Sequence, residues 1–333
     1  MMLVTIPQTY LYRYSEPHQR WHAVGDTLPA HWLPSLQLGY NVFTTFRSDS
    51  ARCWQHAHVK RVQTQARYLG LSVPALSVTQ WVNQLTELIQ SMPNEASPFV
   101  CRLTAMYIAP DTVANPLAVL QSSNAEAPHH ALPTVWVLTL RPAPATPTAE
   151  QAWRTEPSLG LQPVAYTHPL PHLKHGGVGM ALAVQRQACL AKTKLEEAVW
   201  IDSEGVATES THGGLVWLDT HGQWWTPATE RCLASITVQQ LRKALQQLGI
   251  PLQACTLPLA TVLPTLQACW CGNSVRGWLA VHRIGELELP KADSWSASHH
   301  TLIAEVFTQW YRLSVGMDSC YRGGGGTRPL KIR

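Results

Sequence analysis

The sequence is poor in charge, because only 14% of its 333 residues are Asp, Glu, Lys or Arg. The formal net charge is +4, and no basic run occurs, so we expect no nucleic-acid binding. An apolar stretch of eighteen residues is also missing, as is a basic-then-apolar leader, so we expect neither a membrane span nor a signal peptide. With 45% hydrophobic residues, the chain is expected to fold as a globular protein in the cytoplasm.

Metal-binding patterns are also lacking. The eight cysteines include no CxxC pair, and Cys269 and Cys271 form only a CxC within an apolar stretch. The histidine pairs His129–His130 and His299–His300 have no HExxH context. We therefore expect no metal site, and cysteines that are buried and reduced.

Hydrophobic periodicity predicts a mixture of helices and strands, and thus an α+β fold. Gly70 and Gly249 are expected to end two of the helices. The predicted strands are 41–47, 99–108, 134–141, 197–202, 206–209, 214–218 and 223–226, and the predicted helices are 54–69, 78–91, 178–192, 236–248, 258–267 and 300–313.

A proline-rich stretch, PAPATPTAEQ at 142–151, is the best candidate for an interdomain linker. It predicts a smaller N-terminal α/β domain at 1–146 and a larger C-terminal domain at 147–316. The tail 317–333 contains Gly323 to Gly326 and no apolar periodicity, which predicts disorder.

Several short motifs carry groups suited to chemistry. Lys174 lies in HLKHGGVG, Glu209 ends the turn-strand DSEGVATE, and Arg61 lies in HVKRV on a predicted helix. Ile236 and Thr237 open another helix. Taken singly, each of these side chains would be read as an ordinary surface or helix-start residue.

Together, and in this order, they resemble the class IV family of pyridoxal-phosphate enzymes, which includes branched-chain and D-amino acid aminotransferases and aminodeoxychorismate lyases. The resemblance runs from about Gly39 to Val281. It implies a two-domain fold-type IV structure, like that of D-amino acid aminotransferase, with pyridoxal 5'-phosphate between the domains.

The resemblance also implies roles for these residues. Lys174 would join the cofactor aldehyde covalently and then transfer protons. Glu209 would hold the pyridine nitrogen protonated, and the cofactor phosphate would be bound by Arg61, Ile236 and Thr237.

Two further motifs resemble the lyase branch: the strand FTTFR at 43–47 and the turn NSVRG at 273–277. The implied reaction converts 4-amino-4-deoxychorismate to 4-aminobenzoate and pyruvate, on the route to folate. Asn273 and Ser274 join the expected cofactor-binding residues. The candidates for the small-molecule substrate are Thr45, Arg102 and Arg276.

Two alternatives remain open. An aminotransferase of the same fold would act on branched-chain or D-amino acids. A relative without catalysis is the second alternative, because the family's Asn after the lysine and its Arg after the helix-opening pair are missing: Val178, Gly179 and Val238 stand in these places. The resemblance also implies a homodimer.

Overall fold

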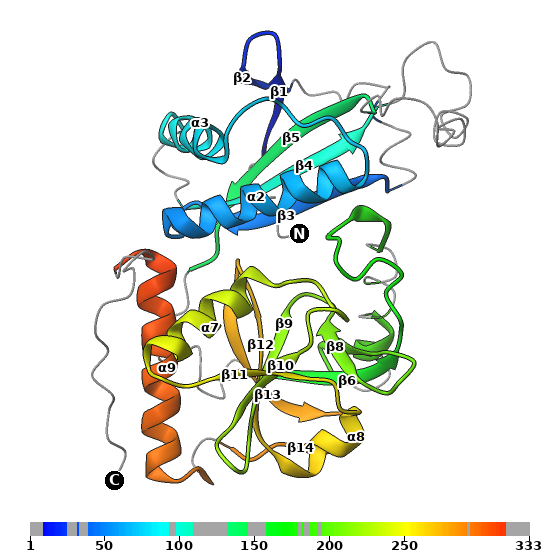
Figure 1. Ribbon diagram of the computed structural model, residues 1–333, viewed down its shortest axis with the longest axis vertical. Coiled ribbons are helices and arrows are strands. Elements are labelled where there is room, and N and C mark those ends of the chain that lie inside the picture. The colour runs from blue at the N-terminus through cyan, green and yellow to red at the C-terminus, as the bar shows by residue number, and fades with distance from the viewer. Residues whose placement is uncertain are drawn as a thin grey trace, which may run out of the picture. The chain divides into compact units, whose positions relative to one another are not determined.

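The computed structural model describes residues 9–24, 32, 39–92, 98–108, 132–145, 158–178, 182, 185, 187–191, 195–291 and 294–317. The chain divides into two compact units (Figure 1). Unit 1 comprises Met1–Ala143 together with Leu173–Gly179, and unit 2 comprises Pro144–His172 and Met180–Arg333. The short segment that carries Lys174 thus belongs to unit 1. The expected boundary after residue 146 lies outside the described residues and stays a prediction, as do residues 318–333 of the tail.

Unit 1 is built on a five-stranded antiparallel sheet (Figure 1). The strand order is β2-β1-β5-β4-β3, so β3 ends the sheet on one side. The strands are β1 (Tyr10–Ser15), β2 (Arg20–Ala23), β3 (Asn41–Arg47), β4 (Phe99–Tyr107) and β5 (Thr134–Pro142).

Helices α2 (Arg52–Tyr68) and α3 (Val78–Gln90) pack against this sheet. The buried side of α2 repeats apolar side chains at helical spacing, and Val59, Val62 and Ala66 are fully buried. Ser77 begins α3 with a capping box, in which it and Gln80 each accept from the other's backbone N–H. Each large side chain buried in this core contributes about 1.5–3 kcal/mol of hydrophobic stabilisation.

Unit 2 is built on a nine-stranded mixed sheet with the order β11-β10-β9-β12-β13-β6-β7-β8, and β14 pairs with β13. Strand β6 runs parallel to both neighbours, whereas β7 and β8 form a hairpin. The strands are β6 (Leu159–Ala165), β7 (Glu197–Ile201), β8 (Ala207–Ser210), β9 (Gly214–Asp219), β10 (Trp224–Pro227), β11 (Leu252–Cys255), β12 (Leu266–Asn273), β13 (Gly277–Ile284) and β14 (Leu287–Glu288).

The sheet of unit 2 buries both of its faces. Helices α7 (Ile236–Gln247) and α9 (Ala297–Val315) cover one face, over Trp224, Trp270 and Trp278. Cys269 and Cys271 alternate with Trp270 along β12 and belong to the second core, on the opposite face. The short helix α8 (Leu259–Val262) packs there.

Most of the predicted elements are confirmed to within a few residues at their ends. The predicted helix 258–267 is wrong: α8 is followed by a 3₁₀ turn, η4 (Leu263–Thr265), and β12 begins at Leu266. Pro264 has no N–H to continue an α-helix, which accounts for the break. Of the predicted helix 178–192, residues 182, 185 and 187–191 are helical, and several others lie outside the described residues.

Six cysteines are free and buried, as expected: Cys101, Cys189, Cys232, Cys255, Cys269 and Cys271. Cys53 corrects the expectation, because it is disulfide-bonded. It lies half-exposed in the first turn of α2. No helix in the described ranges combines the length and the apolar character needed to cross a membrane.

Candidate functional site

Lys174 is held beside β3 by backbone hydrogen bonds. The N–H of Phe43 donates to the carbonyl of Lys174 at 2.9 Å, and Val42 and His175 form an antiparallel bridge. The N–H of Lys174 donates to Oε1 of Gln65, on α2, at 3.3 Å. The lysine backbone is therefore fixed on two sides, by the last strand of the sheet and by a helix. Its Nζ lies 5.2 Å from the centre of the Phe43 ring.

Glycines explain how the segment after Lys174 packs so closely. A Cβ on Gly176 would come within 2.5 Å of Nδ2 of Asn41, and one on Gly39 within 2.8 Å of Cα of Gly177. Gly39 also has φ +64°, in the left-handed region that favours glycine. The 3₁₀ turn η3 (Gly176–Val178) can thus pack against the start of β3, which gives the KHGG motif a structural reason.

Arg61 belongs to a buried network between α2 and β3. Its Nη2 donates to Oγ1 of Thr44 at 2.8 Å, and Oγ1 of Thr44 lies 2.7 Å from Nδ1 of His58. The hydroxyl accepts from Arg61, and its bond with Nδ1 of His58 runs in the direction that the tautomer of His58 sets. The ring of His58 also stacks on Phe46, with centroids 5.2 Å apart. The network therefore orients Arg61 through two uncharged groups.

The pKa of His58 is shifted by burial and by the positive charges near it. Burial lowers its pKa well below the ordinary value of 6.5, and the positive charges of Arg61 and Lys174 lower it further. Both cations are thus near enough to act on the same imidazole, although far apart in sequence. The imidazole is therefore held in its neutral form.

The opposite face of β3 carries the candidate substrate residues. Thr45 pairs with Arg102 of β4 in the strand register, and the guanidinium carbon of Arg102 lies 3.7 Å from the centre of the Phe43 ring. Cys101 and Leu103 are fully buried on the other face, because side chains alternate along a strand, and Arg102 is exposed. The ring of Phe43 therefore has both Lys174 and Arg102 against it.

Glu209 lies on β8 in unit 2, directly after the β7–β8 turn. It lines a hollow that also contains Cys232, Ser235 and Gly214. Burial raises the pKa of Cys232 to about 12, and the negative charge of Glu209 adds to the effect. The carboxylate is therefore close to the residues that precede α7.

The N-terminus of α7 carries the expected phosphate-binding pair. Ser235 caps the helix by accepting from the N–H of Val238, and both Ile236 and Thr237 are buried. Oγ1 of Thr237 lies 3.0 Å from Oγ of Ser274. Two hydroxyls thus meet where the first-turn N–H groups lack intrahelical acceptors. This is a suitable environment for an anion.

The turn after β12 is shaped by Asn273. Its Oδ1 accepts from the N–H groups of Val275 and Arg276, at 3.0 and 2.9 Å, and its Nδ2 donates to the carbonyl of His212 at 3.1 Å. Gly277 ends the turn with φ +71°. The side chain of Asn273 is therefore engaged in structure on both sides of its amide.

Sequence reasoning missed Glu197, at the start of β7. Only 1% of its side chain is exposed, and it accepts from Arg276 at 3.0 Å, from Nδ1 of His212 at 2.9 Å and from the hydroxyl of Thr211. Burial acts to raise the pKa of Glu197, but the bonds from His212 and Thr211 and the charges of His212 and Arg276 outweigh it and lower the pKa to about 2. Glu197 is thus ionised. A glutamate opening a buried strand, EAVWI, was the available signal.

By chemical type, each unit supplies residues that suit a part of pyridoxal phosphate. Such a cofactor needs an amine for its aldehyde, a carboxylate for its ring nitrogen and donors for its phosphate. Groups of these three types are present: the amine of Lys174, the carboxylate of Glu209, and the hydroxyls of Thr237 and Ser274. At the start of α7, glycine is also needed at position 214, because a Cβ there would lie 2.7 Å from the side chain of Val238.

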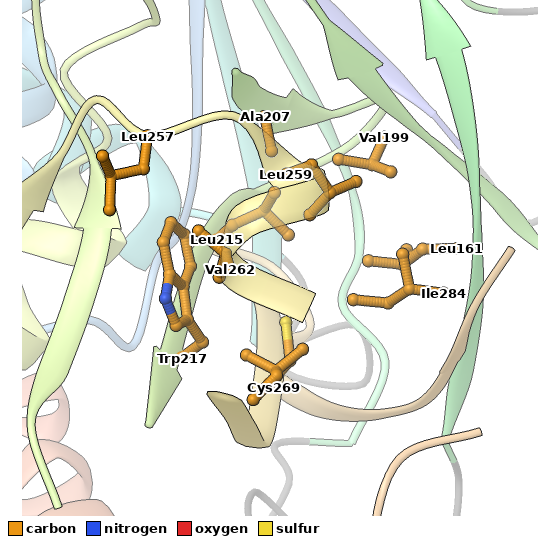
Figure 2. Close-up of a pocket in the computed structure, with 11 residues that line it drawn as sticks. Leu161, Val199, Ala207, Leu215, Trp217, Leu257, Leu259, Val262, Cys269 and Ile284 are labelled. Carbon is orange, nitrogen blue, oxygen red and sulfur yellow. The ribbon is translucent and has the colours of Figure 1, made fainter. Parts of the chain in front are cut away.

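A second hollow in unit 2 has an apolar lining, unlike the hollow beside Glu209. Figure 2 shows that its lining side chains, among them Leu161, Leu215, Trp217 and Ile284, come from the sheet and α8. None of the lining residues is charged. It offers no group to orient a polar substrate, and we assign it to the core.

Comparisons with known proteins give the fold and the family of the chain. The chain is similar in fold to the branched-chain aminotransferase of Thermoproteus uzoniensis with norvaline, with a TM-score of 0.72, 15% identity, and coverage of 93% of this chain and 96% of that one. The match to the Escherichia coli branched-chain amino acid aminotransferase has a TM-score of 0.70 and 16% identity, and it covers 94% of this chain and 97% of that one. The match to a Brucella abortus aminotransferase bound to the cofactor PLP (pyridoxal phosphate) has a TM-score of 0.68 and 16% identity, and it covers 90% of this chain and 99% of that one.

At this level of identity the structural matches show the fold-type IV architecture alone. No curated protein matches the chain in sequence. The sequence profile of the family "Amino-transferase class IV", however, matches residues 41–284, which is most of the chain. The chain therefore belongs to the class IV aminotransferase family, whose enzymes use pyridoxal phosphate.

Proposed function

We propose that the protein is a pyridoxal-phosphate-dependent lyase that converts 4-amino-4-deoxychorismate to 4-aminobenzoate and pyruvate. The observation that carries this proposal is the face of β3 and β4, where Lys174 and Arg102 both lie against the ring of Phe43. A cation beside an aromatic face suits a flat ring that bears carboxylates. An aliphatic amino acid side chain would gain little from Arg102 and Thr45.

The residues take the following roles in this proposal. Lys174 would hold the cofactor covalently, Glu209 would pair with its ring nitrogen, and its phosphate would be bound by Arg61, Ile236, Thr237 and Ser274, with Asn273 shaping the adjoining turn. The bound cofactor supplies an electron sink for the carbon that carries the substrate amine. Arg102 and Arg276 bind the two carboxylates, and Thr45 lines the pocket.

Lys174 is also the proton carrier. Once the substrate amine has displaced it from the cofactor, the freed amine of Lys174 would take the proton from the ring carbon next to the substrate nitrogen. The bond between the ring and the enolpyruvyl oxygen then breaks, and the ring becomes aromatic, which drives the reaction. The same amine returns a proton to the departing three-carbon unit, which leaves as pyruvate. We further propose that the enzyme acts as a homodimer in the cytoplasm, as the family resemblance implies.

The competing function is that of an aminotransferase, which the fold similarity to branched-chain aminotransferases supports. The two are separated by the acceptor, because a lyase needs no 2-oxo acid. The purified enzyme is given aminodeoxychorismate alone, and we expect 4-aminobenzoate and pyruvate in equal amounts. If no product forms, while leucine or a D-amino acid with 2-oxoglutarate turns over, the aminotransferase replaces the lyase. If neither pair of substrates reacts, the protein is a non-catalytic relative.

A further inference from the structure

We propose that His212 and Arg276 together form a carboxylate-binding subsite, which is positioned by the buried carboxylate of Glu197. This inference rests on the proposed function and adds His212 to the substrate-binding residues. It begins from the two oxygens of Glu197. Oε1 accepts from Nη2 of Arg276 at 3.0 Å, and Oε2 accepts from Nδ1 of His212 at 2.9 Å. One carboxylate therefore holds the two basic side chains next to each other.

The subsite is built rigidly, because the two turns that carry it are tied twice. The side chains meet at Glu197, and the backbones are joined through Asn273, which donates to the carbonyl of His212 and accepts from the N–H of Arg276. The turns also pack closely, since a Cβ on Gly213 would lie 2.5 Å from the carbonyl oxygen of Gly272. Such preorganisation lowers the entropic cost of binding a ligand.

The outward sides of both basic groups remain available. The side chain of His212 is 43% exposed and that of Arg276 is 35% exposed. Within the described part of the chain, neither Nε2 of His212 nor Nη1 of Arg276 has a hydrogen-bond partner. Nδ1 of His212 is already bound to Glu197, so Nε2 of His212 and Nη1 of Arg276 are the two nitrogens left to contact a ligand.

The charge balance indicates which anion. The ionised carboxylate of Glu197 offsets the positive charge of Arg276 beside it, so this site is less suited to a phosphate dianion than to a single carboxylate. The subsite also lies near the proposed cofactor-binding residues of unit 2. His212 follows Glu209 by three residues. Arg276 belongs to the same turn as Ser274, whose hydroxyl contacts that of Thr237.

Binding of chorismate to the cofactor-loaded enzyme tests this inference by calorimetry, without turnover. Chorismate carries both carboxylates but has a hydroxyl in place of the amine, so it cannot react with the cofactor. We expect His212→Ala and Arg276→Ala each to weaken binding by about ten- to a hundredfold, the loss of one charge-assisted hydrogen bond. His221→Ala, in an exposed turn of the same sheet, is the matched control and should bind as the wild type does.

Cofactor retention and thermal unfolding are measured on each variant. Unchanged chorismate affinity in His212→Ala would overturn the inference, as would loss of the cofactor instead of the ligand. If the wild-type enzyme neither binds chorismate nor releases 4-aminobenzoate, the lyase function fails separately. The same variants are then titrated with 2-oxoglutarate: weaker binding supports the carboxylate subsite, and unchanged binding overturns it.

Discussion

In unit 1 Arg61 donates to the neutral hydroxyl of Thr44, whereas in unit 2 Arg276 donates to the buried carboxylate of Glu197. Thr44 and His58 orient the first guanidinium without adding negative charge. Glu197 orients the second one and cancels part of its charge. Under the proposed function, this difference would divide the tasks: Arg61 in unit 1 would present its full positive charge to a phosphate dianion, and Arg276 in unit 2 would present a partly offset charge to a carboxylate.

The largest expected effect on turnover comes from removing the side-chain amine of Lys174 in unit 1. Lys174→Ala should lower lyase turnover by about 10²- to 10⁴-fold, the usual contribution of a positioned proton carrier, or abolish it. Turnover is measured with aminodeoxychorismate at saturation. Lys60→Ala removes an exposed lysine of α2 in the same unit and should leave the rate unchanged. Full activity of the Lys174 variant would refute its role.

Removing the buried charge of unit 2 should mainly affect stability. Glu197→Ala leaves Arg276 and His212 without their shared partner, and because both side chains are more than a third exposed, the expected cost in the free energy of unfolding is about 1–3 kcal/mol. Chemical denaturation of this variant and of Glu288→Ala, an exposed glutamate on β14, measures the difference. Equal stability of the two variants would show that Glu197 is not the anchor of this cluster.

The same variant gives a pH test. The folded-state pKa of Glu197 is lowered from 4.5 to about 2, so its stabilisation is present above pH 4.5 and is lost as the pH falls toward 2. The wild-type protein should therefore lose stability over this range by a component that Glu197→Ala lacks. Parallel pH profiles of the two proteins would contradict it.

Next in size is the guanidinium of unit 1. Arg61→Ala should weaken cofactor affinity by about ten- to a hundredfold, because a charge-assisted hydrogen bond to the phosphate is lost. The affinity is measured by titrating the apoenzyme with pyridoxal phosphate. Arg67→Ala, in the last turn of the same helix, is the control. An unchanged dissociation constant for Arg61→Ala would remove this arginine from the phosphate site.

The smallest effect is expected from the hydroxyl that orients Arg61. Thr44→Val keeps the shape but removes the acceptor, at a cost of about 0.5–1.5 kcal/mol in cofactor affinity, or about two- to tenfold. Thr44→Ser retains the hydroxyl and should behave like the wild type. A larger loss in Thr44→Ser than in Thr44→Val would mean that packing, not the hydrogen bond, is what matters here.

The sequence predicted the local features of this comparison and missed the distant ones. The motifs around Lys174, Glu209 and Ile236–Thr237 are contiguous, so a single stretch reveals them. Glu197 and Arg276 are 79 positions apart, and Lys174 and Gln65 are 109 apart, so only the fold brings these partners together. Strand β6 was missed for a local reason: Gly160 and Pro163 are unfavourable in strands, and its two parallel neighbours override that preference.

The most direct test of the central claim is to locate the lysine that carries the cofactor. The holoenzyme is reduced with borohydride, which makes the bond between lysine and cofactor permanent, and its peptides are mapped by mass spectrometry. We predict the pyridoxyl mass on the peptide containing Lys174, next to β3 in unit 1. Finding the pyridoxyl mass on another lysine, such as Lys243 on α7, would contradict the role proposed for Lys174.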